Sequence, residues 1–417
     1  LTLGLGWAIR GHFGHEWGAA WAGVMAGLAV VTVSRRTDWT ARTPVLGALA
    51  GIGWAVGGMM SYGRVVGFCR GAHFLDVYYG LLMLAVIGGL YGLIGGGFLG
   101  LGLETTDRRK PDWAALITQM VATAMLSWGL LIYQLEWLMT PPRSELWAAC
   151  LGAGIALVWY CSRNRFQLAL RSALYSALGA GFGFAFGNFL QTLGTVSGIT
   201  INWWNVMEFT LGFFGGLGMA YGVLTREWPK GVAPSKAANW IAFVFLLLGL
   251  PVINVIQAMK IEKFLQAAGR LGIENGMAFA RFQINIAYLV TAIFFGAALL
   301  VHIRYAERRD KVIASYSPTM FFLFTLFYLA FSHIIKLVFI SGQPFQLNQA
   351  LYWVVVIALV LIWYLNRNKK NSPFLVTGRE SGSRWLLLIG LVLTVLAIWT
   401  FISINIHEGI PGYHERF

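Results

Sequence analysis

Long apolar segments recur along this chain and constrain its fold more than any other feature. Each approaches or exceeds the roughly 20 residues that an α-helix needs to cross a bilayer. The segments are 16–34, 44–62, 75–103, 113–138, 145–161, 168–190, 205–225, 236–257, 280–302, 316–341, 347–366 and 384–406. Transmembrane β-strands would be shorter and would alternate in hydropathy, and no such pattern is visible. The sequence predicts an all-α polytopic membrane protein with about 12 transmembrane helices.

The composition agrees with this class. Only 12% of the residues are charged, against about a quarter in an average soluble domain. The chain starts at Leu1, inside a further apolar stretch. By analogy with 44–62 and 168–190, we interpret residues 1–9 as the outer end of one more, truncated N-terminal span.

Positive charge alternates between the predicted loops and orients the chain. The net charge is +14, which by itself is also typical of nucleic-acid-binding proteins. Of the 31 lysines and arginines, 21 fall in every second loop: Arg35, Arg36, Arg42, Arg108, Arg109, Lys110, Arg163, Arg165, Arg171, Arg226, Lys230, Lys236, Arg304, Arg308, Arg309, Lys311, Arg367, Lys369, Lys370, Arg379 and Arg384. The positive-inside rule assigns these loops to the cytoplasm. We therefore expect a plasma (inner) membrane protein that contacts anionic lipids and binds no nucleic acid.

Three stretches of the chain are nearly alike: GLGWAIRGHFG from Gly4, GIGWAVGGMMSYG from Gly51 and GFGFAFGNFLQTLG from Gly181. Each is followed by an acidic residue and then by an apolar, glycine-spaced run. Small residues at three- and four-residue spacing let helices pack closely in lipid. The pattern predicts a parallel internal repeat of helical hairpins.

The repeat also predicts two parts of the chain. Residues 1–235 form a repeat-containing, glycine-rich transmembrane core, and residues 236–417 add C-terminal transmembrane helices. Between 258 and 281 a polar segment places its apolar residues on one helical face, which is typical of an amphipathic helix lying in the membrane interface.

Polar side chains at membrane depth are expensive and mark candidate sites. In this topology they gather at the outer ends of the spans. The substrate-binding candidates are Arg10, Arg64, Arg70, Asn188, Asn205 and Glu208, and the catalytic candidates are His12, His15, Glu16, His73 and Asp76. Because arginine suits carboxylate, phosphate and sulfate groups, we expect an extracytoplasmic chamber for an anionic or zwitterionic molecule. Residues 10–16 and 64–76 are the expected working site, and the third copy around Glu208 completes its wall.

A metal site is the weaker interpretation of the first connection. His12, His15 and Glu16 form an HxxHE pattern, and histidines three apart can share a helix face and bind zinc. The order differs from HExxH, and Gly11 and Gly14 favour a bent connection. We therefore predict no metal, and the sequence leaves the cofactor unknown.

Three functions stay open on the sequence alone. The first is a transporter or permease for a small polar solute, because internal repeats are frequent in transporters. The second is a membrane-embedded transferase or hydrolase acting on a lipid-linked or glycan substrate at the outer leaflet, with histidine as base. The third is a structural or cofactor-carrying subunit of a membrane complex, which would need a membrane-protein partner or a second copy of the chain.

Overall fold

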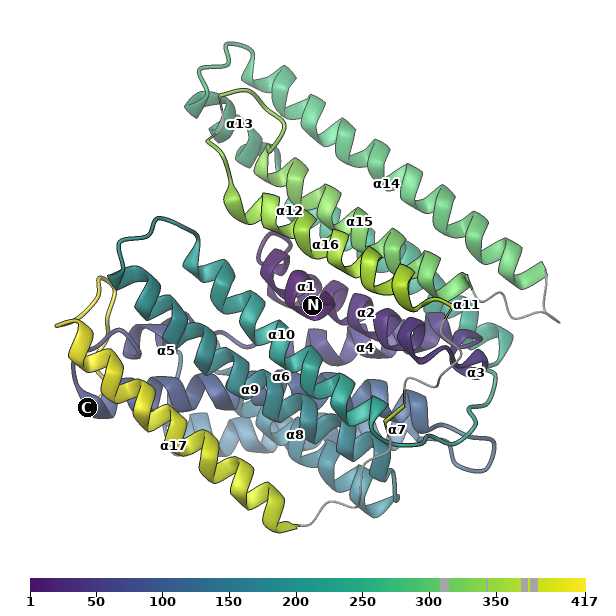
Figure 1. The fold of residues 1–417 in the computed structure, drawn as a ribbon, viewed down its shortest axis with the longest axis horizontal. Coiled ribbons are helices and arrows are strands. Elements are labelled where there is room, and N and C mark those ends of the chain that lie inside the picture. The colour runs from purple at the N-terminus through teal and green to yellow at the C-terminus, as the bar shows by residue number, and fades with distance from the viewer. Residues whose placement is uncertain (308–314, 343, 369–373, 376–381) are drawn as a thin grey trace.

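The structure is a computed structural model that describes residues 1–307, 315–342, 344–368, 374–375 and 382–417. Within these ranges every regular element is a helix and no strand is present (Figure 1). This confirms the predicted all-α class. Eleven helices of the described chain are long and apolar enough to cross a membrane. The helix at the remaining predicted span, α4 (Thr43–Gly58), has only 16 residues, so the count of about 12 stays a prediction.

The first part of the chain forms a group of helices around α6 and α9. Its elements are α1 (Thr2–Arg10), α2 (His15–Ser34), α3 (Thr37–Thr40), α4, α5 (Gly63–Phe68), α6 (Phe74–Glu104), α7 (Trp113–Trp128) with a π-helical turn (Gly129–Gln134), α8 (Leu146–Arg163), α9 (Gln167–Val196) and α10 (Trp203–Leu224).

A second group of helices follows (Figure 1). It contains α11 (Lys236–Val244), a π-helical turn (Phe245–Gly249), α12 (Leu250–Ala258), α13 (Ile261–Arg270), α14 (Gly276–Glu307), α15 (Tyr316–Lys336) and α16 (Leu347–Asn366). The predicted amphipathic segment 258–281 is helical as α13 over ten residues, which buries Phe264 and exposes Lys263 and Arg270. Residues 276–281 belong instead to the long helix α14.

The last helix, α17 (Gly382–Ile406), returns to the first group and packs against α6 and α9. The buried apolar side chains accordingly form two cores. The helices α1 and α2 contribute to both: Trp7 and Ala22 belong to the first core, and Ala8 and Trp21 to the second. The α1–α2 hairpin therefore lies between the two groups.

Glycine allows the central helices of the first group to touch backbone to backbone. A methyl group added at Gly88, Gly92 or Gly96 of α6 would collide with the carbonyl oxygens of Ala180, Ser176 and Ser172 of α9, respectively. The four-residue spacing on both helices keeps these contacts in register along the interface. The predicted close packing of the glycine-spaced runs is present here, whereas the internal repeat stays a prediction.

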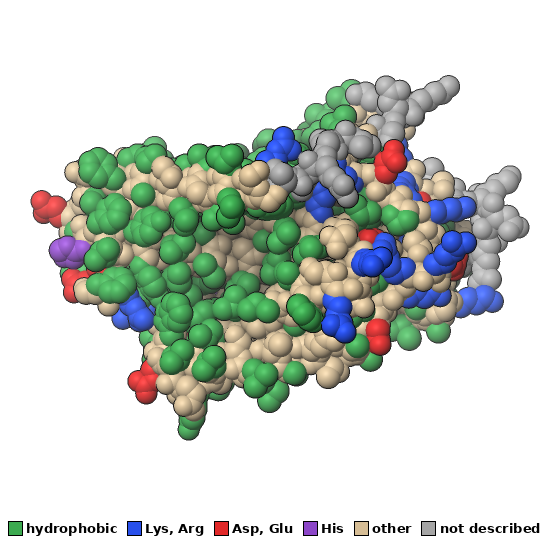
Figure 2. Space-filling view, turned by 90° about the horizontal axis from the view of Figure 1, so that it is seen from below, with side chains coloured by type: hydrophobic (Ala, Val, Ile, Leu, Met, Phe, Trp, Pro, Cys, Tyr) green, Lys and Arg blue, Asp and Glu red, His purple; other side chains and the backbone are tan. Residues whose placement is uncertain are grey.

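Lysine and arginine side chains gather toward one end of the molecule, and apolar side chains cover much of the flank between the two ends (Figure 2). We call this the basic end. It is the end at which α3 lies, while α5 and α13 lie at the opposite end (Figure 1). Six members of the predicted cytoplasmic set lie outside the described residues: Arg308, Arg309, Lys311, Lys369, Lys370 and Arg379.

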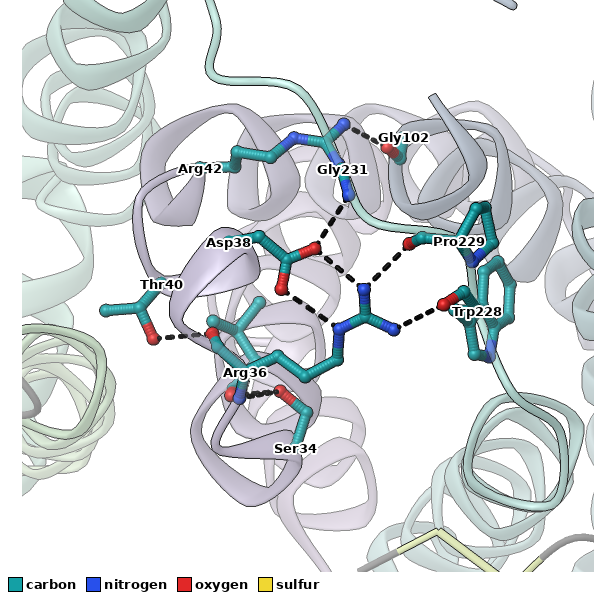
Figure 3. A network of polar contacts seen from close by, with 10 residues as sticks. Ser34, Arg36, Asp38, Thr40, Arg42, Gly102, Trp228, Pro229 and Gly231 are labelled. Atoms are coloured by element: carbon teal, nitrogen blue, oxygen red, sulfur yellow. Dashed lines mark hydrogen bonds and ion pairs between the residues drawn. The ribbon is translucent and has the colours of Figure 1, made fainter. Parts of the chain in front are cut away.

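An arginine–carboxylate pair fastens the basic end (Figure 3). Arg36 donates from Nε and Nη2 to the two carboxylate oxygens of Asp38, at 3.0 and 2.8 Å, and also to the carbonyl oxygens of Trp228 and Pro229. The backbone N–H of Gly231 donates to Asp38 as well, at 2.7 Å. Burial raises the pKa of Asp38, but these hydrogen bonds outweigh it and leave that pKa below its usual value. The contacts tie α3 and the α2–α3 connection to the α10–α11 connection.

Candidate functional site

A pocket of about 640 Å³ is lined in part by Gly63 and Arg64 of α5, the helix that lies at the end opposite the basic end (Figure 1). The pocket is bounded by the start of α2, the α4–α5 connection, the α7–α8 connection, the start of α10 and the segment after α17. Its polar and aromatic lining consists of His15, Glu16, Ser61, Tyr62, Arg64, Arg143, Ser144, Trp204 and His414. Two arginines against one glutamate favour a negatively charged or zwitterionic occupant.

Beneath this pocket lies a buried charge pair. The Arg10 guanidinium is 1% exposed, and its Nη2 is 3.7 Å from Oε1 of Glu208 on α10. Tyr62 stands between them: its hydroxyl accepts from Arg10 Nη2 at 3.0 Å and donates to Glu208 Oε1 at 2.6 Å. Tyr62 also lines the pocket, whereas Arg10 and Glu208 do not, so the Tyr62 side chain connects the pocket to the two charges.

The local sequence explains why these groups meet. Arg10 ends α1 and donates to the main-chain oxygen of His15 across the turn, where Gly14 adopts a φ of +90°. Its guanidinium lies 4.7 Å from the Trp7 ring centre, one helical turn earlier. Burial and the nearby Glu208 hold the pKa of Tyr62 well above its usual value, so the phenol stays protonated and can donate.

One wall of the pocket is held by a carboxylate. Glu145 accepts hydrogen bonds from the backbone N–H groups of Met139 and Thr140 and from the indole of Trp147. Its side chain is 6% exposed. These bonds fix the loop that carries Arg143 to the pocket.

The second predicted connection is divided between two places. Arg64 lines the pocket and donates to Nδ1 of His414 at 2.9 Å. Arg70 and Asp76 instead bind the segment after α17: Arg70 donates to the carbonyl of Pro411, and Asp76 accepts from the N–H of Arg416 and Phe417. His73 is exposed. Of residues 64–76, the structure therefore brings only Arg64 to the pocket that His15 and Glu16 line, and it places Arg70 and Asp76 against the segment after α17.

The two histidines of the first connection also diverge. His12 hydrogen-bonds to Ser332 on α15, whereas His15 lines the pocket. The pKa of His12 is lowered to about 3, first by burial and then by Lys336, Lys263 and His333. This imidazole is therefore neutral. The candidate metal ligands His12, His15 and Glu16 do not converge, and the described residues contain no cluster of three or more potential metal-ligating side chains.

The candidates from the third copy have different surroundings. Glu208 is part of the buried network beneath the pocket. Asn188 is buried and donates to Gln191, and Asn205 joins helices by donating to the carbonyl of Ala8 and accepting from Asn348. Neither asparagine lines the pocket.

Tyr62, Trp204, Arg143, Glu145 and His414 were not among the residues predicted from the sequence. Only Tyr62 carried a signal, because it stands within the second of the three similar stretches. Arg143, Trp204 and His414 come from distant parts of the chain, and only the packing of the helices places them at the pocket, while Glu145 holds the loop that carries Arg143.

Comparison of the chain with protein families, with curated proteins and with solved structures finds no match.

Proposed function

We propose that this chain is a membrane permease for a small anionic or zwitterionic solute, which enters the pocket from the extracytoplasmic side of the plasma (inner) membrane. The observation that carries this proposal is the position of Tyr62. One side chain both lines the pocket and hydrogen-bonds the buried Arg10 and Glu208.

The pocket supplies the chemistry for recognition. Arg64 and Arg143 offer planar guanidinium groups, which bind carboxylate or phosphate oxygens through paired hydrogen bonds. Glu16 can accept from a cationic group of a zwitterion. The rings of Tyr62 and Trp204 are stacked with centres 5.8 Å apart and give the solute an apolar face.

The buried pair supplies a second position deeper in the helix bundle. If Tyr62 rotates away, its two hydrogen bonds are lost and the Arg10 guanidinium faces the pocket. The solute then replaces the phenol as the partner of Arg10 and continues between the helices. Tyr62 would therefore act as a gate with two discrete arrangements. In one its hydroxyl bonds Arg10 and Glu208, and in the other the solute bonds Arg10.

Uptake into proteoliposomes tests the gate. A panel of radiolabelled phosphate, sulfate, succinate and amino acids first identifies the transported solute. Tyr62→Phe keeps the ring and removes both hydrogen bonds; because bonds to charged groups contribute about 1.5–3 kcal/mol each, the rate of uptake should change by about tenfold or more. Tyr133→Phe is the matched control, since Tyr133 is 74% exposed.

Arg64→Gln should weaken solute binding in the same assay, whereas Arg163→Gln, at an exposed position at the end of α8, should not. If no solute of the panel is taken up by the reconstituted wild-type protein, or if Tyr62→Phe and Arg64→Gln both transport like wild type, the permease proposal fails.

A specific observation favours a second candidate, a transferase or hydrolase acting at the outer leaflet. His15 and Glu16 both line the pocket, and an imidazole beside a carboxylate is a usual general base. Incubation with lipid-linked glycans and analysis of the products by mass spectrometry tests it. Turnover that is lost in His15→Gln and kept in Tyr62→Phe would support the enzyme over the permease.

A further inference from the structure

The segment 407–417, after α17, lies against α5 and the start of α6. Two main-chain hydrogen bonds join it to α5 and the residues that follow: the N–H of Ile410 donates to the carbonyl of Arg70 at 3.0 Å, and the N–H of His414 donates to that of Gly67 at 3.1 Å. The segment is therefore docked along its length, and not only at one point.

Asp76 fixes the far part of the same segment. Its Oδ1 accepts from the N–H of Arg416 at 2.6 Å and from that of Phe417 at 3.1 Å, and its side chain is buried. The Phe417 ring packs edge-on against Tyr79. Asp76, one of the predicted catalytic residues, therefore binds the main chain of segment 407–417.

His414 connects this docking to the pocket. Its ring lines the pocket, and its Nδ1 accepts a hydrogen bond from Arg64 Nη1 at 2.9 Å. The Nε of Arg64 is buried and has no hydrogen-bond partner. The imidazole therefore occupies a donor of the same guanidinium that an anionic solute would use.

The docked segment has little else to hold it. Within 407–417 only Ile410 is buried, at 6% exposure, and the other side chains are exposed or half-buried. Segments with few buried apolar contacts open at low free-energy cost. Its attachments are hydrogen bonds, each of which contributes little net free energy because it replaces bonds to water, and the contacts of Phe417 and Arg416 with the Tyr79 ring.

We propose that segment 407–417 is a displaceable strap that closes the outer pocket, with His414 occupying Arg64 until an anionic solute takes its place. This inference rests on the proposed function for the nature of the solute. The closing of the pocket by the strap can be tested without any solute.

The test uses a cysteine introduced in the pocket, Ser61→Cys, and two thiol reagents of opposite charge, the anionic MTSES and the cationic MTSET. The parent chain, whose three cysteines are buried, gives the background. Gly67→Ala displaces the strap, because a methyl group there would collide with the His414 ring. Gly63→Ala adds the same methyl group on the same helix, at a pocket-lining residue with nothing within 4 Å of the added methyl, and is the matched control for the methyl group itself.

Gly67→Ala should raise the rate of MTSES labelling by about fivefold, the ratio expected for loss of one hydrogen bond, and should raise MTSET labelling less, because the freed Arg64 attracts anions. Hydrogen–deuterium exchange checks the strap directly: the amides of 410, 414, 416 and 417 should lose protection in Gly67→Ala and in Asp76→Ala but not in Gly63→Ala.

Loss of that protection with unchanged MTSES labelling would show that the segment does not close the pocket and would overturn the proposal. Protection that persists in both Gly67→Ala and Asp76→Ala would overturn it too, since the segment would then not be displaceable. Both results are independent of solute uptake, so failure of the strap and failure of the permease are distinguishable.

Discussion

At Arg10, one guanidinium satisfies a main-chain carbonyl, a phenol and a carboxylate while it has almost no exposure. A buried charge is tolerated only where its partners offset the cost of removing it from water. Here each partner belongs to a different element: His15 to α2, Tyr62 to the α4–α5 connection and Glu208 to α10. The Arg10–Glu208 pair therefore keeps all its partners only when α1, α2, the α4–α5 connection and α10 are correctly packed against one another.

Removing Arg10 should consequently be more damaging than removing an exposed arginine. We expect Arg10→Met to lower the free energy of unfolding by about 3–5 kcal/mol, because Glu208 is left as an uncompensated buried charge. Denaturant unfolding of the purified protein in detergent measures this. Arg163→Met is the control at an exposed position. Adding Glu208→Gln to Arg10→Met should recover part of the loss; a double variant no more stable than the single one would contradict the explanation.

His414 should make the docking of segment 407–417 depend on pH. Burial, with Arg64 and Arg70 adding to it, lowers the pKa of His414 in the docked state. A base with a lowered pKa stabilises docking fully above its free value of about 6.5, and the stabilisation is lost as the pH falls below that value. Burial also lowers the pKa of His407 in the same segment, so a variant at His414 separates the two imidazoles.

Amide protection of residues 410–417 should therefore decrease between neutral pH and about pH 5 after correction for intrinsic exchange. His414→Phe should dock more weakly and without this dependence. A wild-type segment whose corrected protection is constant over that range would show that the Arg64–His414 hydrogen bond does not stabilise docking.

At the scale of elements, hydropathy located most helices, because the backbone must satisfy its own hydrogen bonds in lipid. It failed where an apolar run leaves the helix. The predicted span 44–62 ends early at Gly58, and the Met60 carbonyl accepts from the Tyr91 hydroxyl of α6. The two methionines after Gly58 have the same hydropathy inside or outside a helix, so hydropathy does not locate the helix end.

The sequence predicted which residue types form the candidate site, but not which way each side chain points. Residue types at the pocket end indicated an arginine- and histidine-containing site, and Arg64, His15 and Glu16 do line the pocket. Where a side chain points depends on partners far along the chain. His12 turns to Ser332, and Asp76 turns to Arg416; neither partner lies near in the sequence.

The α6–α9 interface offers a prediction at the same scale. Gly92→Ala should destabilise the protein by about 1–3 kcal/mol, the usual range for overpacking, because its methyl group would overlap the Ser176 carbonyl. Gly89→Ala on the same helix meets only the Ala177 carbonyl at 3.7 Å, an ordinary contact, and should be neutral. Thermal unfolding followed by tryptophan fluorescence distinguishes them, and equal losses would contradict close packing as the cause.

At the scale of the whole molecule, the concentration of lysine and arginine at one end and the pocket at the other give the protein a direction (Figure 2). The positive-inside rule then predicts that the basic end faces the cytoplasm. The Arg36–Asp38 cluster and the outer pocket would lie on opposite sides of the membrane.

Cysteines at two exposed positions test this orientation. Asp107→Cys lies in the α6–α7 connection and Glu408→Cys in the segment after α17. In intact cells a membrane-impermeant maleimide should label Glu408→Cys and should reach Asp107→Cys only after permeabilisation. The opposite result would invert the assignment of the pocket to the extracytoplasmic side.

The position of the α1–α2 hairpin between the two cores has a consequence for biosynthesis. Helices enter the membrane in chain order, so Ala8 and Trp21 expose their side of the hairpin until α15 has been inserted, since Trp21 stacks on Tyr328 there. The faces of α6 and α9 that pack against α17 stay uncovered for longer, until α17 has been inserted. Neither core can be completed before the other has begun, and the nascent chain therefore carries helix faces that contact lipid until α15 and α17 have been inserted.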